Sequence, residues 1–239
     1  MITLYVNAPY ASFRKSFARS FAESYPLPPP ATVYGMLLSL VGEHFRRRHE
    51  GVRLAFAYGC REAEGGDCGR PCLPRVATTL RKLSRYKYGV PGKQSELGNA
   101  LDFVETLCGV EFLCWVDSSQ ERESEEGQPI DETLEERLTD ALENPGSVMR
   151  SGVLCLGLSD DAVNEVSLRL SSDGMWHRLL PSDTGSIELP VWVDHIGAAD
   201  TRWQRFHFEP RASCLADMPG NDVWQWTEIL NPTHLRQQS

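Results

Sequence analysis

The spacing of apolar residues predicts a strand and then a helix near the N-terminus. Apolar and polar positions alternate from Ile2 to Val6, the period of a strand with one buried face, and we expect Asn7 to Pro9 to end it. Prolines up to Pro30 hold the next stretch extended, because the residue before a proline avoids the helical region. From about Ala31 to Arg48 the apolar residues recur every 3.6 positions and indicate a helix. A second face of this helix holds only small residues: Gly35, Ser39 and Gly42. Small side chains let another backbone approach closely, so we expect this face to pack tightly on the chain's own sheet.

The same patterns recur further along the chain and define a fold class. Val52 to Tyr58 alternates and predicts a strand, and Val110 to Val116 is apolar on both faces and predicts a central strand. The apolar residues between Ile130 and Leu142 mark a second helix, and Val153 to Leu158 and Val166 to Leu170 are further strand-like runs. The order strand, helix, strand, excursion, strand, helix, strand is the split order of a ferredoxin-like α+β fold, βαββαβ, with an antiparallel sheet behind two helices.

The chain divides by pattern into a larger and a smaller part. We expect the ferredoxin-like domain over residues 1–170, with an excursion at about residues 70–95. Residues 171–239 contain short strand-like runs, turns and five tryptophans, which predict a small β-rich C-terminal lobe.

The charged residues are unevenly distributed. The net charge of −9, taken as an average, disfavours a nucleic-acid partner. Residues 1–95, however, contain 15 Lys and Arg against 6 Asp and Glu, whereas residues 96–143 contain 2 against 15. Residues 70–95 contain seven cations, no carboxylate, two tyrosines and a Gly-Val-Pro-Gly turn, so we expect a projecting basic hairpin that binds phosphates. The alternative is that the acidic block neutralises these cations within the chain.

A second group of cations and aromatic rings follows the first predicted strand. Phe13 stands beside Arg14 and Lys15, Arg19 follows, and Ser24-Tyr25-Pro26 forms a rigid turn. Unstacked RNA bases lie on aromatic rings while Arg and Lys follow the backbone, so this combination is typical of single-stranded RNA binding. The alternative is that the aromatic rings pack into the core and the cations are ordinary surface residues.

Other chemistries find little support in the sequence. The chain contains seven cysteines, an odd number, and several of them lie in apolar runs. We therefore expect reduced thiols. Cys60, Cys68 and Cys72 match no zinc-ligand spacing, and no hydrolase motif is present, so we expect neither a metal nor a cofactor. No window approaches 18 uncharged apolar residues and no signal-peptide pattern opens the chain. The expectation is a cytoplasmic protein without membrane contact.

Three blocks of the sequence resemble a known family. The stretch from Phe13 to Gly42, with its Ser-Tyr-Pro-Leu-Pro-Pro-Pro run, resembles the N-terminal signature of the Cas-five family, the RAMP-type subunit of type I CRISPR Cascade complexes. Arg150 to Ser159 followed by Val163 to Val166 resembles the family's second, glycine-containing block. Leu189 to His195 and Trp203 to Phe206 resemble its DevS-like (Myxan) branch.

The resemblance implies a binding role and a set of residues. Members of the family cap the 5′ handle of crRNA and contact the large subunit and the backbone subunits of Cascade, which recognises target DNA in antiviral defence. A thumb hairpin in the family separates the handle from the guide, and Arg75 to Lys93 is the segment we assign to it. The RNA-binding residues expected from the resemblance and from the local chemistry are Phe13, Arg14, Lys15, Arg19, Ser20, Ser24, Tyr25, Arg75, Arg81, Lys82, Arg85, Tyr86, Lys87, Arg150 and Gly152.

Two other functions stay open at this point. One branch of the family cleaves precursor crRNA with a helix Tyr and a neighbouring Lys-His pair, a reaction in which Tyr34 would act with His44 or Lys87. None of the six His residues adjoins a Lys, so that acid-base pair is missing and we expect a non-catalytic subunit. A third hypothesis is an interaction scaffold in which the acidic residues 117–143 dock on a basic partner.

Overall fold

Strand β1 (Ile2–Ala11) lies between two antiparallel neighbours, β6 (Glu96–Asp117) and β7 (Glu165–Leu168). Strand β3 (Arg53–Arg61) pairs with the other edge of β6. The order is therefore β7-β1-β6-β3, with every neighbouring pair antiparallel. The computed structural model describes residues 1–15, 21–61, 69–87, 96–122, 131–168, 174–194, 200–214 and 225–231.

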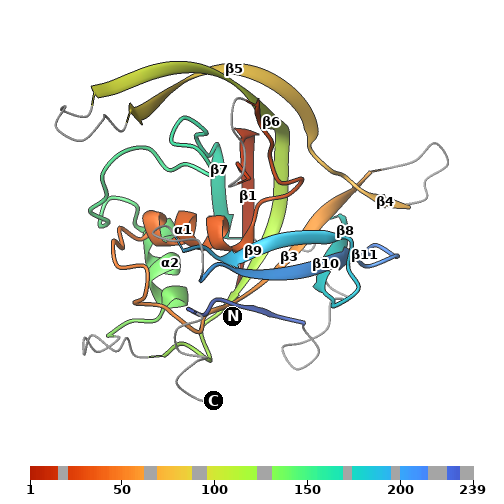
Figure 1. Ribbon diagram of the computed structural model, residues 1–239. Helices are drawn as coiled ribbons and strands as arrows, with labels where there is room; N and C mark the ends of the chain where they lie inside the picture. Colours follow the sequence, from red (N-terminus) through yellow and green to blue (C-terminus); the bar gives the residue numbers. More distant parts are fainter. Residues whose placement is uncertain are drawn as a thin grey trace.

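Two helices pack on one face of this sheet, α1 (Pro30–Leu40) and α2 (Leu134–Glu143) (Figure 1). Leu4 of β1, Leu37 of α1 and Leu138 of α2 belong to one cluster of fully buried side chains. Burying a side chain of this size contributes about 1.5–3 kcal/mol, so this cluster holds both helices on the sheet. Within the described ranges, no helix is long and apolar enough to cross a membrane.

The strands that follow residue 171 continue the same sheet. Strand β8 (Met175–Pro181) pairs with β3, β10 (Arg202–Phe208) pairs with β8, and β9 (Ile187–Trp192) pairs with β10. Leu189, Phe206 and Ile229 join the core cluster that contains the helices. This part of the chain is β-rich, as expected, while the division into residues 1–170 and 171–239 stays a prediction. This part also contains the short strands β11 (Ser213–Cys214), which pairs with β8, and β12 (Thr227–Glu228), which pairs with β3.

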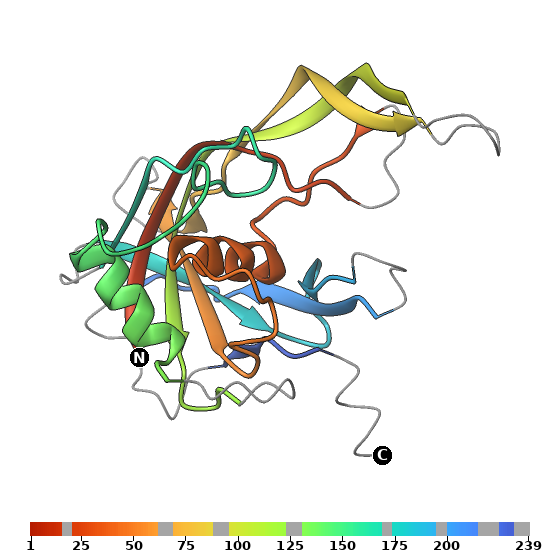
Figure 2. The same cartoon turned by 90° about the vertical axis from the view of Figure 1, so that its left-hand side faces the viewer.

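The basic excursion forms a long hairpin. Strand β5 (Arg75–Lys87) pairs with the first part of β6, from Arg75 opposite Cys108 to Lys87 opposite Glu96. The hairpin arches over the rest of the molecule (Figures 1 and 2). Two short strands flank it: β2 (Phe21–Ala22) runs parallel to β6, and β4 (Arg70–Pro71) pairs with β3. The predicted turn at residues 88–95 lies outside the described residues.

Several predicted boundaries are wrong, because contacts between distant parts of the chain set them. Strand β1 runs on through Pro9 to Ala11, because the long strand β6 pairs with it as far as Leu107. Helix α1 ends at Leu40 rather than near Arg48. Gly42 has a φ of 69°, and a Cβ there would collide with the carbonyl oxygen of Met149, so the chain turns at this glycine.

The apolar run from Val153 to Leu158 is also not a strand. It is a loop that doubles back on itself, with an isolated bridge between Cys155 and Ala162, and the strand of this region is β7. The central strand predicted at Val110 to Val116 is confirmed, because β6 lies between β1 and β3.

The expectation of reduced thiols is wrong for Cys60, which is disulfide-bonded. Five further cysteines of the described residues are reduced thiols: Cys72, Cys108, Cys114, Cys155 and Cys214.

Candidate nucleic-acid interface

A groove opens where the end of β1, the start of α1, the loop at residues 157–161 and strands β9 and β10 meet. Its larger part has a volume of about 710 Å³. A smaller part of about 300 Å³ shares Thr32, Gly157 and Val193 with it and extends along α1 past Gly35 and Ser39. Gly35 has no heavy atom within 4 Å of a Cβ position, so the predicted packing of the small-residue face on the sheet is wrong at this residue. We call the two parts together the groove.

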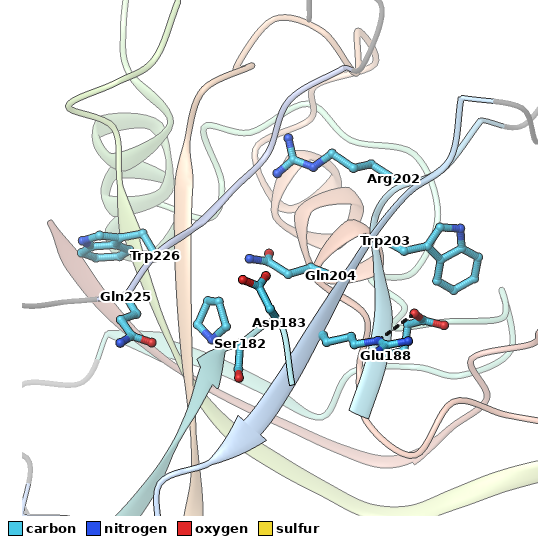
Figure 3. A pocket seen from close by; sticks show the side chains of 10 residues that line it. Ser182, Asp183, Glu188, Arg202, Trp203, Gln204, Gln225 and Trp226 are labelled. Atoms are coloured by element: carbon cyan, nitrogen blue, oxygen red, sulfur yellow. Dashed lines mark hydrogen bonds and ion pairs between the residues drawn. The ribbon is translucent and has the colours of Figure 1, made fainter. Parts of the chain in front are cut away.

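Two aromatic rings from distant parts of the chain form one wall of the groove. Tyr25 and Trp203 have ring centroids 5.9 Å apart and planes tilted by 57°. Tyr25 is buried, whereas the Trp203 side chain is 41% exposed. The side chains of Trp203 and Gln204 point to opposite sides of β10, and a polar cavity lined by Asp183, Gln204 and Trp226 shares Trp203 and Glu188 with the groove (Figure 3). The indole face of Trp203 is therefore available for stacking a planar ligand.

Hydrogen bonds between two neighbouring segments, one with Phe13 and the other with Ser24 and Tyr25, hold the Tyr25 side of the groove in place. The Phe13 amide donates to Ser24 Oγ at 2.9 Å, and the Tyr25 amide donates to the Phe13 carbonyl at 2.8 Å. The Ser24 amide donates to Glu105 Oε2 of β6 at 2.9 Å, which fixes this pair of segments to the base of the hairpin. The Phe13 ring is 3% exposed and packs in the core, the alternative that the sequence left open.

The predicted cations divide into exposed and paired ones. Arg14 lines the groove, is exposed, and has no ion pair within the described part of the chain. Lys15 pairs with Glu23 at 3.0 Å, a contact between two partly exposed side chains that salt would weaken. Arg75 and Lys82 of the hairpin are exposed, whereas Arg81 is 16% exposed and pairs with Asp161 at 2.6 Å.

Other predicted residues lie elsewhere or outside the description. Arg150 and Gly152 are exposed but do not line the groove, and the glycine that does line it is Gly157. The backbone positions of Arg85, Tyr86 and Lys87 are on β5, while their side chains lie outside the described residues, as do Arg19 and Ser20 entirely.

Most residues of the groove were not predicted as a binding site, among them Gly157, Leu158 and Trp203. These three come from a loop and a strand far from Phe13 in the sequence, and no spacing connects them. Only their place within the second and third family-like blocks singled out these segments.

The sheet face opposite the helices carries a different chemistry. Tyr5 of β1 donates to Glu111 of β6 at 3.0 Å. Burial, together with the hydrogen bond and the charge of Glu111 and the charge of Glu165, raises the pKa of Tyr5 to about 12. These carboxylates would repel phosphates, and two carboxylates, Glu188 and Asp194, also line the groove. The groove is the better candidate for a nucleic-acid interface because an exposed cation, Arg14, and an exposed indole, Trp203, line it as well.

The hydroxyl of Tyr34 is unsuited to attack or proton transfer. Its side chain is 2% exposed, and its Oη donates to the Arg46 carbonyl at 2.9 Å. Burial raises the pKa of this hydroxyl far above its usual value. Tyr34 lines the smaller part of the groove, but its hydroxyl is hydrogen-bonded within the protein.

Comparison with known proteins points to one family. Residues 1–147 match the family described as CRISPR-associated protein (Cas_Cas5). A Myxococcus xanthus (strain DK1622) protein, named CRISPR-associated protein Cas5, is 36% identical over 208 residues, which cover 85% of this chain and 88% of the relative.

Among solved structures, a chain of one titled CRISPR RNA-guided surveillance complex aligns with a TM-score of 0.52 at 13% identity, over 92% of this chain and 95% of that chain. A chain of another, titled Crystal structure of Cas protein, aligns with a TM-score of 0.44 at 15% identity, over 87% and 93%. The first of these two alignments indicates a shared fold.

Proposed function

Because the chain belongs to the Cas5 family of CRISPR-associated proteins, we propose that it is a non-catalytic subunit of a type I CRISPR surveillance complex and binds the 5′ handle of crRNA in the groove. The observation that carries this proposal is the groove itself. It combines an exposed indole, that of Trp203, with an exposed guanidinium, that of Arg14. Single-stranded RNA is recognised by stacking, by phosphate contacts and by hydrogen bonds to splayed bases.

In this proposal each part of the groove has its own task. A base stacks on Trp203, for which base stacking on an aromatic residue contributes about 1–3 kcal/mol. Arg14 neutralises a phosphate of the same strand, and Lys15 assists once its partner Glu23 is displaced or screened. Polar atoms near Gly157 and Leu158 contact base edges or 2′-hydroxyls, which distinguish RNA from DNA.

The architecture supports assigning the chain to the RAMP-type ferredoxin-like fold. The order β7-β1-β6-β3, antiparallel throughout and with α1 and α2 on one face, is the order expected for βαββαβ. The hairpin of β5 and the first part of β6 then corresponds to the thumb.

The hairpin also supports the proposed protein partners, the large subunit and the backbone subunits of the complex. Its outer face carries four exposed apolar side chains, Val76, Leu80, Leu101 and Phe103, each between 55% and 68% exposed. Large exposed apolar patches mark protein interfaces. Target DNA is then reached through the assembled complex rather than by this subunit alone.

Footprinting of the assembled complex tests the proposal. We expect the complex that contains the wild-type subunit to protect a short 5′ segment of crRNA from nuclease. Arg14→Ala weakens this protection, and the matched control Arg122→Ala, which removes a 52% exposed cation that does not line the groove, leaves it unchanged. Equal protection by complexes with and without this subunit would reject the proposal.

The endoribonuclease alternative is tested separately. The purified protein is incubated with a repeat-containing RNA in EDTA, and cleavage is read on a denaturing gel. We expect no cleavage, because Tyr34 is buried. Cleavage that is lost in Tyr34→Phe or His44→Ala would establish the alternative.

A further inference from the structure

We propose that Asp161 is a positioning residue for RNA binding, and that Arg81 acts through it rather than by contacting a phosphate. The carboxylate of Asp161 holds two segments of the groove wall together and ties both to the base of the hairpin. This inference rests on the proposed function, because it concerns how the same groove is kept in shape.

The Asp161 carboxylate accepts hydrogen bonds from three donors. Its Oδ2 accepts from the Ser12 amide at 2.7 Å and from the Leu158 amide at 3.1 Å. Its Oδ1 accepts from Arg81 Nη1 at 2.6 Å. The side chain is 1% exposed, so these bonds replace water as its solvation.

Both amides belong to the groove wall. Ser12 precedes Phe13 and Arg14, and Leu158 lines the groove directly. The backbone of Gly157, which has a φ of 109°, lies against that of Ser12: a Cβ on this glycine would be 2.7 Å from the Ser12 carbonyl oxygen. The wall is thus one backbone packed on another, and a single carboxylate hydrogen-bonds to both.

The remaining contacts of Arg81 are also made to the protein. Its Nη2 donates to Thr106 Oγ1 at 3.2 Å and its Nε to Thr79 Oγ1 at 3.3 Å, while the two threonine hydroxyls lie 2.8 Å apart. Ser12 Oγ lies 3.2 Å from Thr106 Oγ1. A phosphate would have to compete with this network for the guanidinium, unlike at the exposed Lys82 next to it.

The two roles of Arg81 make different predictions for the salt dependence of RNA binding. Each phosphate contact to a single strand contributes about 0.7 to the slope of log affinity against log salt. Loss of a positioning residue lowers affinity at every salt concentration but leaves this slope unchanged, because no phosphate contact disappears.

The experiment measures handle-RNA affinity of the full-length protein, in its complex, over a range of salt concentrations. We expect Asp161→Asn, which keeps the volume but removes the charge and replaces one of the two acceptor oxygens by a donor, to reduce affinity at least about tenfold at unchanged slope. Arg81→Met gives the same result, and the double variant is no weaker than either single variant, because the residues act as one unit. Arg14→Ala, by contrast, lowers the slope by about 0.7.

The matched control is Glu209→Gln. It removes the carboxylate of another part-buried ion pair, with Arg178 at 2.6 Å, that does not line the groove, and affinity stays unchanged. Either single variant leaves a buried charge unpaired and can fail to fold for that reason. In that case the double variant, which removes both charges, tests the inference: its slope of log affinity against log salt should equal that of the wild type.

A lowered slope in a variant of Arg81 would show that Arg81 contacts a phosphate, and wild-type affinity in folded Asp161→Asn would show that Asp161 is only structural. Either outcome overturns the inference while the proposed function stands. Absence of handle binding by the wild-type protein would instead overturn the proposed function.

Discussion

Tyr25 and Trp203 are 5.9 Å apart between ring centroids, although one precedes α1 and the other lies on β10. Burial and the nearby charge of Glu188 raise the pKa of Tyr25, which keeps its hydroxyl protonated and able to donate. The pair joins the N-terminal and C-terminal parts of the chain in a single wall of the groove. The proposed binding of RNA in the groove therefore requires both parts.

Trp203→Ala is expected to weaken binding of handle RNA by about 5- to 150-fold, the equivalent of about 1–3 kcal/mol for one stacked base. Trp203→Phe retains most of the affinity because it keeps an aromatic face. Fluorescence anisotropy with labelled RNA measures both. Phe45→Ala, which removes an aromatic ring that is 61% exposed and does not line the groove, is the control and binds as the wild type. Equal affinities for Trp203→Ala and the wild type would exclude stacking on this indole.

Local periodicity was enough to predict β1 and both helices, and the charged stretch with its Gly-Val-Pro-Gly turn was enough to predict the hairpin, because each of these elements is specified by residues close in sequence. The helix end at Leu40 could not be predicted in this way, because it depends on the contact of Gly42 with the backbone at Met149, far along the chain. Only the N-terminal residues of the groove could be predicted, because the others reach it through contacts between distant parts of the chain. Arg14 and Tyr25 stand in a recognisable cluster, whereas Trp203 reaches the site only through the pairing of β8, β9 and β10 onto β3.

The exposed apolar face of the hairpin is expected to be needed for assembly rather than for folding. The double variant Leu80→Ser, Phe103→Ser removes two side chains that are 58% and 55% exposed, so the isolated protein should fold normally. We expect it to be lost from the complex on size-exclusion chromatography after co-expression with its partner subunits. Val153→Ser, at a 70% exposed position outside the hairpin, is the matched control. Normal assembly of the double variant would mean that partners bind another surface.

The ion pair of Glu209 and Arg178 is expected to contribute stability that disappears in acid. Two hydrogen bonds from Arg178, at 2.8 and 2.6 Å, hold the pKa of Glu209 below its usual value. A carboxyl whose pKa is lower in the folded state stabilises the protein above its unfolded pKa, near 4.3, and this contribution is lost as pH falls through the folded pKa. The gap in melting temperature between wild type and Glu209→Gln should therefore be full at pH 7 and close below about pH 4. A gap that stays constant down to pH 3 would contradict this account.

Gly35 and Gly157 are expected to respond in opposite ways to the same substitution. Gly35 lies inside α1 with open space around its Cβ position, so Gly35→Ala should stabilise the protein by about 0.5–1 kcal/mol, because alanine restricts the unfolded chain and favours helix. Gly157 has a φ of 109° and a Cβ position 2.7 Å from the Ser12 carbonyl oxygen, so Gly157→Ala should destabilise it by about 1–3 kcal/mol.

For a chain of this size 1 kcal/mol corresponds to about 2–4 °C in melting temperature, so calorimetry should resolve a rise for the first variant and a larger fall for the second. A fall for Gly35→Ala would show that the wall of the groove along α1 closes on this glycine, and that the face of small residues packs tightly after all.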